Sequence, residues 1–413
     1  MKALVFEHAL ARTAVTKALG MVCKRAFVGP TSPLRLGELP VPELPAADWV
    51  RIGTRLCGLC GSDYKQVALK GSMDNPMTAL ISFPQVLGHE VVGVVEETGG
   101  DVSSRKPGER VLLNPWLSCV PRGLEPCRWC REGELAQCEN FTRGNLSAGI
   151  HHGNCREATG GFAEMLVAHE SQCIPIPDGV SDEAAVLGDP FAVSLHAVLR
   201  EPPPPRATVL VYGCGTLGLC SIAILRMRYP TARILAVARY GHQGRLAARL
   251  GAHRVLEHRP ARRLIESVAG ETATDIRRPW YGLPMLTGGV DVVYDTVAKA
   301  ETLEVGVRIT RPRGTIVVTG VEVPKRFEWT PLYFKEISLV GSNAFGFETM
   351  DGRRRHAMQW YLDFVAAGKV DVTPMLTHRF PIDRYREAML CCLDQGRSGA
   401  VKVAFEFPPA RGN

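Results

Sequence analysis

An apolar run that passes directly into a glycine-rich turn constrains this chain of 413 residues more than any other feature. Residues 208–219 read T-V-L-V-Y-G-C-G-T-L-G-L, which places Gly213, Gly215 and Gly218 in a G-x-G-x-x-G spacing. The pattern predicts a strand, a tight turn at Gly213, a backbone that a ligand can approach at Gly215, and a helix that lies close to the strand at Gly218. Because a helix N-terminus attracts phosphate, a dinucleotide is the expected ligand.

The next predicted strand bears on which dinucleotide binds. It covers 232–237 and ends about 20 positions after the glycines, where an NAD-binding unit usually places an acidic residue for the ribose 2′-hydroxyl. This chain has Arg239 there instead. Without a carboxylate nothing repels a 2′-phosphate, and Arg239 offers a planar charged fork to bind one, helped by His242 or Arg245. The sequence therefore favours NADP, whereas a merely solvated Arg239 would leave NAD as the cofactor.

Beyond Gly218 the chain alternates predicted helices and strands, which indicates a doubly wound parallel sheet. Further strands are expected at 290–294 and 315–319, so Thr296 and Val321 follow strand ends where a dinucleotide lies. Residues 272–288 exceed a usual connection of about 4 to 6 residues and are interpreted as a surface insertion.

Composition excludes several classes of function. The chain is 46% hydrophobic and 22% charged with a net charge of +7, which is ordinary for a globular protein with room for two domains. The basic residues are dispersed, so a solvated face or an anionic cofactor explains them better than nucleic acid. No apolar run reaches the length of a membrane span and no secretory signal is found, so we expect a cytoplasmic protein without a membrane partner.

Residues 8–27 interrupt the predicted fold near its start. Residues 1–7 read as a strand, and the following segment holds Arg12, Lys17, Lys24 and Arg25 without any acid. An organelle transit peptide has a similar composition. An inserted helix or loop is the favoured interpretation, because a strand of the fold precedes the segment.

Four of the thirteen cysteines gather in one short polar loop. Cys127-x2-Cys130-x7-Cys138 is a metal-ligand spacing, and Cys119 lies just upstream in the same loop. In a chain without a secretion signal, zinc is favoured over disulfides. We expect a four-cysteine zinc site, and a site with three cysteines or no metal is the alternative.

A second metal site is predicted from two separated motifs. C-G-L-C-G-S-D supplies Cys60, and V-L-G-H-E supplies His89 with Glu90 beside it. A thiolate and an imidazole from separate loops, with a neighbouring carboxylate, can build a zinc site with an open position. Cys57 competes with Cys60 for the ligand role. The paired histidines within 149–156 lack the spacing of either site, and this loop is interpreted as lining a substrate cleft.

At these motifs the chain resembles the zinc-dependent medium-chain dehydrogenase/reductase superfamily, in its alcohol, polyol and threonine dehydrogenase group. The likeness covers nearly the whole chain and includes G-G-F-A-E at 160–164, similar to the family's entry to the strands before the cofactor domain. It implies an α/β protein. A GroES-like, mainly β catalytic domain would cover residues 1–188, completed by 345–413, and a Rossmann domain with a doubly wound parallel sheet would cover 189–344. A homodimer or homotetramer is implied as well.

The resemblance also implies the ligands of the catalytic zinc. Cys60 and His89 match ligand positions, and Glu90 matches the neighbouring carboxylate that binds or releases the metal. Family members carry Cys or Glu as a third ligand where this chain has Asp189. Asp189, Glu90 or a water would then complete the shell.

At the positions for proton transfer and for the structural zinc, some residues of this chain match the family and others differ. Ser62 stands where the family has a Ser or Thr that takes the alcohol proton. Lys65 replaces the usual His of the relay and either takes the proton or is a surface lysine. Lys402 matches a basic residue that reaches the cofactor. In the structural zinc loop Leu124 occupies the family's first cysteine position, so Cys119 would have to reach the metal through an enlarged loop.

Together these features predict an oxidoreductase with two zinc ions per chain. It would transfer a hydride between an alcohol, secondary or polyol-like, or the matching carbonyl compound, and NAD(P), with NADP preferred. The alternatives are a zinc-free quinone or enoyl reductase and a non-catalytic NADPH-binding zinc protein. The predicted cofactor-binding residues are Gly213, Gly215, Thr216, Leu217, Gly218, Arg239, Thr296, Val321 and Lys402.

Overall fold

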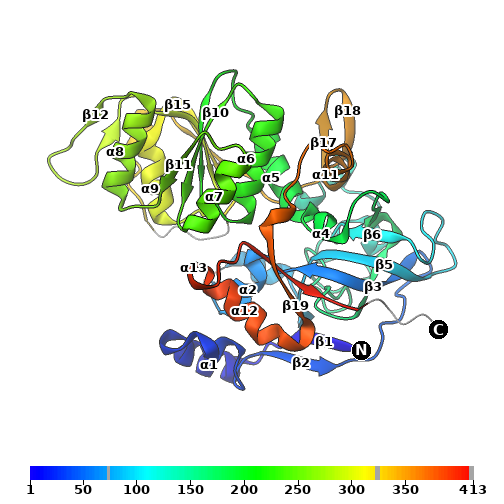
Figure 1. Cartoon of the computed structure of the whole chain (residues 1–413). Coiled ribbons are helices and arrows are strands. Elements are labelled where there is room, and N and C mark those ends of the chain that lie inside the picture. Colours follow the sequence, from blue (N-terminus) through cyan, green and yellow to red (C-terminus); the bar gives the residue numbers. More distant parts are fainter. Residues whose placement is uncertain (72–74, 321–325, 409–413) are drawn as a thin grey trace. The chain divides into compact units, whose positions relative to one another are not determined.

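The computed structural model describes residues 1–71, 75–320 and 326–408, and its internal contacts divide the chain into two units. Unit 1 consists of Met1–Asp189 with Thr349–Asn413, and unit 2 is Pro190–Glu348. Figure 1 labels the elements along the chain. Among the described residues, no helix is both long enough and apolar enough to cross a membrane.

Unit 2 is built on a six-stranded parallel sheet, which confirms the prediction from the alternating helices and strands. The strand order is β11-β10-β9-β14-β15-β16, the order of a Rossmann fold. Val209 in β9 pairs with Ile234 in β10 on one side and with Val292 in β14 on the other. The elements are β9 (Thr208–Tyr212), α6 (Thr216–Arg228), β10 (Arg233–Ala238), α7 (Gly241–Arg249), β11 (Arg254–Glu257), α8 (Ala261–Thr272), β14 (Val290–Asp295), α9 (Ala300–Ile309), β15 (Thr310–Val318), α10 (Thr330–Phe334) and β16 (Ser338–Gly341).

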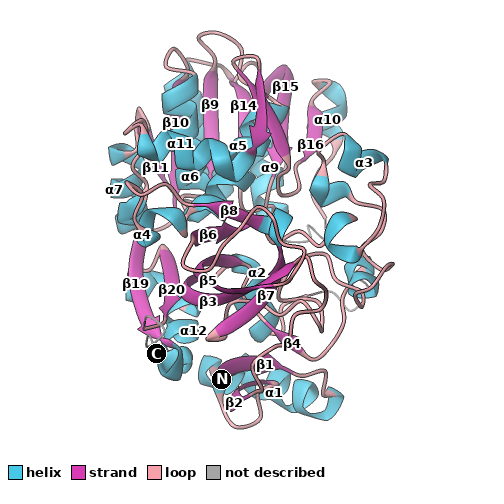
Figure 2. Cartoon of the chain, turned by 90° about the vertical axis from the view of Figure 1, so that its right-hand side faces the viewer, coloured by secondary structure: helices cyan, strands magenta, loops and turns pink. Residues whose placement is uncertain are grey.

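The sequence forms this sheet because its strands are apolar on both faces. Val209, Leu210 and Val211 are all fully buried, as expected for a parallel sheet with helices on each side. Figure 2 shows β9, β10, β14 and β15 as neighbouring strands with helices around them. Leu264 of α8 and Leu303 of α9 join one core cluster with the strands.

The insertion expected at 272–288 forms a small hairpin on the surface of unit 2. Its strands are β12 (Ile276–Arg277) and β13 (Met285–Leu286). Trp280 and Tyr281 at its tip are more than nine-tenths exposed. The interpretation as a surface insertion is confirmed.

Unit 1 is mainly β. A seven-stranded sheet has the order β19-β20-β3-β5-β6-β8, with β7 also paired to β3, and a smaller sheet has the order β2-β1-β4. The elements are β1 (Lys2–Phe6), β2 (Leu34–Glu38), β3 (Trp49–Gly58), α2 (Gly61–Val67), β4 (Gln85–Val86), β5 (Glu90–Thr98), β6 (Arg110–Leu113), α3 (Arg128–Arg131), β7 (Met165–His169), β8 (Cys173–Pro175), α4 (Asp182–Ala185), β18 (Arg353–His356), α11 (Ala357–Ala366), β19 (Leu376–Pro381), α12 (Tyr385–Leu393), α13 (Gln395–Ser398) and β20 (Lys402–Glu406). Two elements contain a boundary between the units, α5 (Gly188–Arg200) and β17 (Phe347–Met350).

The core of unit 1 lies against the larger sheet. Val50, Ile52 and Val91 point into it from β3 and β5, and Phe405 joins them from β20. Because β20 pairs antiparallel with β3, the C-terminal strand lies beside the strand that leads into the first zinc motif, with Phe405 opposite Cys57. This pairing brings Lys402 to the site described below.

The inserted segment between β1 and β2 contains a helix, as the favoured interpretation of residues 8–27 predicts. It forms α1 (Leu10–Val22) and a short 3₁₀ helix, η1 (Lys24–Val28). Both Figure 1 and Figure 2 draw α1 at the margin of unit 1, next to β1 and β2.

A buried histidine makes the stability of unit 1 sensitive to acid. His356 caps α11, where its Nδ1 accepts a hydrogen bond from the backbone N–H of Met358 at 3.3 Å. Burial lowers the pKa of His356 from 6.5 to about 3. In that pH interval the unfolded chain binds a proton that the folded protein does not, so stability is lost as the pH falls from 6.5 towards 3.

Replacing His356 by Asn keeps a capping acceptor and removes this titration. Between pH 7 and 4.5 the wild type should lose about 2.5 kcal/mol more unfolding free energy than the variant, because each pH unit below the unfolded pKa contributes about 1.4 kcal/mol. Urea unfolding at the two pH values measures the loss of unfolding free energy in each protein. The other histidines contribute equally to both losses, so their effect cancels in the comparison. Equal losses would contradict the assignment.

Candidate active site and metal centres

Cys60 is the N-cap residue of α2 because the C-G-S-D spacing forms a capping box. Its thiol accepts a hydrogen bond from the backbone N–H of Asp63, and the Asp63 carboxylate accepts one from the backbone N–H of Cys60 at 2.8 Å. Reciprocal bonds of this kind fix the first turn of a helix. The motif therefore sets the position of the Cys60 sulfur through local structure.

His89 and Glu90 approach Cys60 from the start of β5. One ligand atom from each of the three residues lies within 4.8 Å of the others. A thiolate, an imidazole and a carboxylate with room for a further ligand are the donors of a catalytic zinc site, so the residues fit a zinc ion. Cys57 is not in this group. It is fully buried, which raises its pKa well above the ordinary value and keeps the thiol protonated.

Asp63 supports His89 as well as the helix. Its Oδ1 lies 3.7 Å from Nδ1 of His89, and both side chains are nearly fully buried. Burial opposes the charge on His89, but the Asp63 carboxylate and the neighbouring Cys60 raise its pKa well above the ordinary value. A carboxylate beside one ring nitrogen commonly orients a metal-binding histidine. This role of Asp63 was not predicted from the sequence, although its position three residues after Cys60 could have indicated it.

Glu90 is held by a buried ion pair with Lys402. The carboxylate contacts the ammonium directly, and these side chains are 1% and 2% exposed. Lys402 also donates to the carbonyl of Leu59 at 3.2 Å. Burial lowers the pKa of Lys402, but the combined attraction of Glu90, Cys60 and Asp189 outweighs burial and raises the pKa overall. A Cβ at Gly58 would collide with both side chains, so glycine makes room for the pair. That Lys402 reaches a cofactor stays a prediction.

Asp189 stands at the start of α5 and is 4% exposed. Burial raises its pKa to about 7, while the nearby His89 lowers it and Glu90 raises it. Asp189 is thus close enough to interact electrostatically with the three-residue group. It is not among the residues whose ligand atoms lie within 4.8 Å of one another, whereas Glu90 is.

A cavity of about 220 Å³ adjoins this group in unit 1. Ser62, Asp63, His151 and Asn154 are among the residues that line it. The ring centroids of His151 and His89 are 4.5 Å apart. Nδ1 of His151 is 2.6 Å from the carbonyl oxygen of His152. Burial, followed by repulsion from His89, lowers the pKa of His151 to about 3, so the ring is neutral at pH 7.

The loop that carries His151 therefore lines a cavity next to the candidate metal site, as its interpretation from the sequence suggests. Neither His151 nor His152 belongs to a metal-binding group among the described residues. Ser62 is exposed to the cavity. Lys65 is on the same helix but is not one of the residues that line it.

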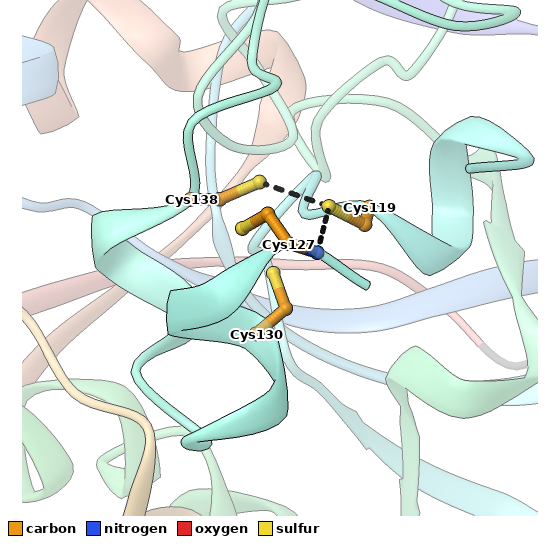
Figure 3. A group of neighbouring side chains, drawn as sticks. All are labelled: Cys119, Cys127, Cys130 and Cys138. Carbon is orange, nitrogen blue, oxygen red and sulfur yellow. Dashed lines mark hydrogen bonds between the residues drawn. The ribbon is translucent and has the colours of Figure 1, made fainter. Parts of the chain in front are cut away.

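The four cysteines predicted to hold a structural zinc lie together, as Figure 3 shows. The sulfurs of Cys119 and Cys138 are 3.5 Å apart. Tetrahedral zinc with Zn–S bonds of about 2.3 Å places sulfurs about 3.8 Å apart, so the donor set fits the metal. Backbone N–H groups of Cys127 and Asn140 also donate to the Cys119 and Cys138 sulfurs, each at 3.3 Å. Cys119 therefore replaces Leu124 as the fourth member of the cluster.

Protonation of this cluster is shared among its thiols. A hydrogen bond from Cys138 lowers the pKa of Cys130 to about 5, and the same bond raises that of Cys138. Burial raises the pKa of Cys119. Zinc requires thiolates, so its binding must displace protons and weaken in acid.

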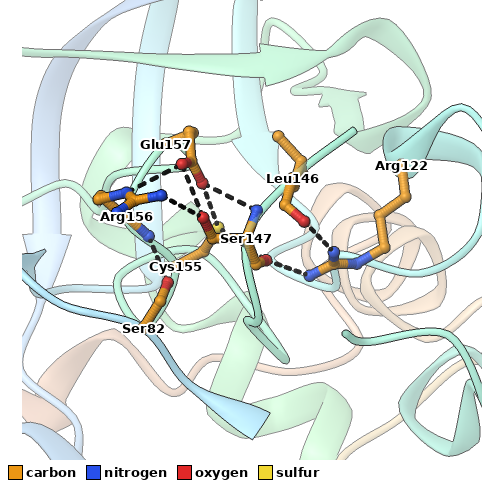
Figure 4. Close-up of polar contacts among 7 residues, drawn as sticks. All are labelled: Ser82, Arg122, Leu146, Ser147, Cys155, Arg156 and Glu157. Carbon is orange, nitrogen blue, oxygen red and sulfur yellow. Dashed lines mark hydrogen bonds and ion pairs between the residues drawn. The ribbon is translucent and has the colours of Figure 1, made fainter. Parts of the chain in front are cut away.

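A buried arginine forms the enlarged loop that brings Cys119 to the cluster. The Arg122 guanidinium is 0% exposed and donates five hydrogen bonds to backbone carbonyls. Figure 4 shows two of these bonds, to Leu146 and Ser147, next to a second network centred on Glu157. Arg122 uses all its donor groups to fix the loop around the cysteines. The acceptors are the carbonyls of Leu117, Arg143, Leu146, Ser147 and Gly149.

In unit 2 the glycine turn after β9 has the geometry that its sequence predicts. Gly213 has a φ of +94°. A Cβ at Gly218 would collide with the carbonyl of Gly213, while a Cβ at Gly215 would meet nothing within 4 Å. Gly213 and Gly218 are therefore required by the turn itself, and Gly215 leaves open space before α6. Thr216 and Leu217 begin that helix.

Of two further candidate residues of the cofactor site, Thr296 and Val321, the structure describes only Thr296. The Thr296 hydroxyl lies 3.0 Å from the carbonyl of Tyr212 and 3.1 Å from that of Gly213, so it ties the ends of β14 and β9 together. Val321 lies outside the described residues. The buried Asp295 carboxylate accepts from the backbone N–H groups of Val297 and Ala298 and thereby shapes the turn after β14.

Arg239 follows β10 and is exposed, as a residue that meets a ligand must be. Its guanidinium lies over the Tyr240 ring, 5.5 Å from the centroid. Tyr240 in turn stacks on His242, with 5.7 Å between ring centroids and 7° between planes. This arrangement presents a positive charge at the carboxyl end of β10, where the ribose of a dinucleotide is expected.

Comparisons with known proteins agree with this geometry. Residues 46–178 match the alcohol dehydrogenase GroES-like domain, and residues 216–366 match the zinc-binding dehydrogenase family. The chain is 28% identical to L-idonate 5-dehydrogenase of Vitis vinifera over 377 residues, which cover 91% of this chain and 92% of the relative.

Two solved structures share the fold. An alcohol dehydrogenase of Escherichia coli CFT073 in complex with NADH is 23% identical, with a TM-score of 0.71 over 98% of this chain and 99% of that one. A Sinorhizobium meliloti 1021 protein bound to NADP is 25% identical, with a TM-score of 0.68 over 91% of this chain and 96% of that one. With its GroES-like part, its Rossmann-type sheet and its two groups of metal-binding side chains, this chain belongs to the medium-chain, zinc-dependent dehydrogenase superfamily.

Proposed function

We propose that this protein is a zinc-dependent oxidoreductase that prefers NADP and interconverts a secondary or polyol-like alcohol with its carbonyl compound. The observation that carries the proposal is the group of Cys60, His89 and Glu90 beside a cavity lined by Ser62 and His151. Cys60, His89 and Glu90 would hold a zinc ion that would serve as Lewis acid for the substrate oxygen, and a bound nicotinamide would supply or accept the hydride.

The side chains around the group divide the remaining tasks. Asp63 orients His89, and Lys402 holds the carboxylate of Glu90 in place. Ser62 is exposed to the cavity and takes the alcohol proton. His151, neutral at pH 7, offers a polar contact to a second hydroxyl of the substrate. This polar lining supports a hydroxylated substrate, in line with the Vitis vinifera relative named for its action on L-idonate.

Arg239 supports the preference for NADP. It is an exposed cation at the end of β10, where a carboxylate would repel a 2′-phosphate. The Sinorhizobium meliloti protein bound to NADP is consistent with this proposal, whereas the NADH complex of the Escherichia coli protein shows that the fold also takes the other cofactor.

A panel of primary, secondary and polyhydroxylated alcohols tests the function. Formation of reduced nicotinamide is followed by absorbance with NADP and with NAD, on protein whose zinc has been counted. We expect turnover of a secondary or polyhydroxylated alcohol with NADP. Turnover of quinones or enones alone would favour a zinc-free type of reductase, and cofactor binding without any turnover would favour a non-catalytic protein.

Replacing Asp189 by Ala tests its part in the zinc shell. We expect loss of one zinc ion per chain and a decrease in turnover on the order of 100-fold, the upper range for residues that support a metal site. Asp189→Glu, which restores the longer carboxylate of the family, should keep both. Zinc analysis with the alcohol assay measures the two quantities. Full activity of the Ala variant would remove Asp189 from the site.

Replacing Arg239 by Ala tests the cofactor preference. The Michaelis constant for NADP should rise about 10-fold or more, because a hydrogen bond to a charged group contributes about 1.5–3 kcal/mol, while that for NAD should change little. Arg249→Ala, at the other end of α7, is the matched control and should alter neither. Equal effects on the two cofactors would show that Arg239 does not recognise the 2′-phosphate.

A further inference from the structure

Helix α1 presents its apolar face to solvent. Leu10, Met21 and Val22 are 74%, 82% and 93% exposed, and Val15 and Leu19 are about half exposed. Ala11, Ala14 and Ala18 are exposed as well. At 3.6 residues per turn these eight side chains cover about 180° of the helix surface without a polar residue among them. A surface helix normally shows the opposite arrangement, with apolar side chains facing the core.

Small and polar residues attach the inner face of α1 to unit 1. Thr16 is fully buried, and its hydroxyl lies 3.1 Å from that of Thr31. Gly20 leaves space for the ring of Phe27, which a Cβ would strike. The segment is fixed further through η1, where Arg386 of α12 donates to the carbonyl of Val28 at 3.0 Å. The apolar face is therefore held outward by specific contacts on the other side.

Basic residues border this apolar face. By helical position the exposed Lys17 follows one edge, next to Leu10. Arg12 follows the other edge, next to Leu19, but it is only partly exposed and its Nη1 is buried. Lys24 and Arg25 continue beyond the C-terminal end, and residues 8–37 contain no acid. The one ion pair of these four residues among the described contacts joins Lys24 to Asp394 at 3.6 Å. An apolar stripe with Lys and Arg at its borders is the pattern of a helix that lies in a membrane interface.

We propose that α1 docks this protein onto the surface of a bilayer that contains anionic lipids. The helix would lie in the plane of the interface, with its apolar side chains among the acyl chains and its basic residues at the headgroups. A second copy of the chain fits less well, because a two-fold contact through this face brings like charges together. The expectation of no membrane partner rested on the absence of a spanning segment, and a helix on the surface needs none.

Vesicle sedimentation with the full-length, zinc-loaded protein tests the proposal. The protein should sediment with vesicles containing about one-third phosphatidylserine, bind pure phosphatidylcholine less, and be released by high salt, which screens the basic residues. Leu19→Glu and Val22→Glu should each weaken binding about 10-fold or more, since each removes an apolar side chain from the acyl region. Both positions are exposed, so zinc content and thermal unfolding should stay unchanged.

Val41→Glu is the matched control, because Val41 is 44% exposed elsewhere in unit 1. It should bind vesicles like the wild type. The proposal is overturned if the wild type does not sediment with anionic vesicles, or if the α1 variants bind as well as the control. It is also overturned in favour of self-association if the wild type is a dimer that Leu19→Glu dissociates, without any binding to vesicles.

Discussion

Replacing Cys119 by Ser should remove about one zinc ion per chain and lower the free energy of unfolding by several kcal/mol. The four sulfurs already lie within 4.8 Å of one another, close enough to share one metal ion. Structural zinc contributes about 10–16 kcal/mol of apparent binding energy in isolated zinc-finger peptides. In this protein Arg122 and the surrounding fold also hold the loop, so the effect should be smaller than in a peptide that folds only with metal.

Zinc analysis after dialysis and urea unfolding with and without a chelator measure this effect. Cys391→Ser is the matched control, since Cys391 is a partly exposed cysteine outside both metal-binding groups. It should keep its zinc and its response to the chelator. A Cys119 variant that keeps the full zinc content would show that three cysteines suffice, the alternative that the sequence left open.

The arrangement around Cys119 also shows where inference from the sequence ends. The C-x2-C-x7-C spacing indicates a zinc site because those three ligands are set by local chain geometry. The fourth ligand depends on how residues 120–126 fold, and that depends on Arg122, which bonds carbonyls as far away as Gly149. No local pattern in the sequence contains this information.

Unit 2 was predictable for the opposite reason. The strands after the glycine turn are short apolar runs, and the helices between them are amphipathic except for the largely buried α6. A parallel sheet requires this alternation of strands and helices. Some observed strand boundaries differ by a few residues from the predicted ones. For example, β15 begins at Thr310, although a start at Thr315 was predicted. The bulge between β14 and β15 explains the difficulty, since it breaks the regular register after Val290.

Around the candidate catalytic site the ligand motifs were visible in the sequence but their supports were not. Asp63 lies within the C-G-L-C-G-S-D motif, yet its contact with His89 depends on how α2 packs against the start of β5. Gly58 and Lys402 are 344 positions apart, and only the pairing of β20 with β3 brings them together. The outward face of α1 was equally hidden, because a helical pattern does not say which face the fold covers.

Replacing Lys402 by Met should lower the free energy of unfolding of the metal-free protein by about 3–5 kcal/mol, the usual cost of breaking a buried ion pair. Met has a similar length and leaves little cavity, so the loss comes chiefly from the Glu90 carboxylate, which keeps its burial and loses its cation. Urea unfolding after removal of zinc measures it. Arg397→Met, a basic residue close in sequence but outside the pair, is the control.

Combining Lys402→Met with Glu90→Gln should restore most of this stability, because the double variant no longer buries an unpaired charge. A double variant as unstable as Lys402→Met alone would mean that packing, and not the ion pair, causes the loss.

Zinc makes the same variant a test of Glu90 as a ligand. If the carboxylate faces the metal, bound zinc replaces part of the missing positive charge, and Lys402→Met should be less destabilising in the zinc-loaded protein than after chelation. If Glu90 serves only the ion pair, the two losses should be equal. The comparison therefore shows whether the buried Glu90 carboxylate interacts with zinc as well as with Lys402. It does not require an assay of turnover.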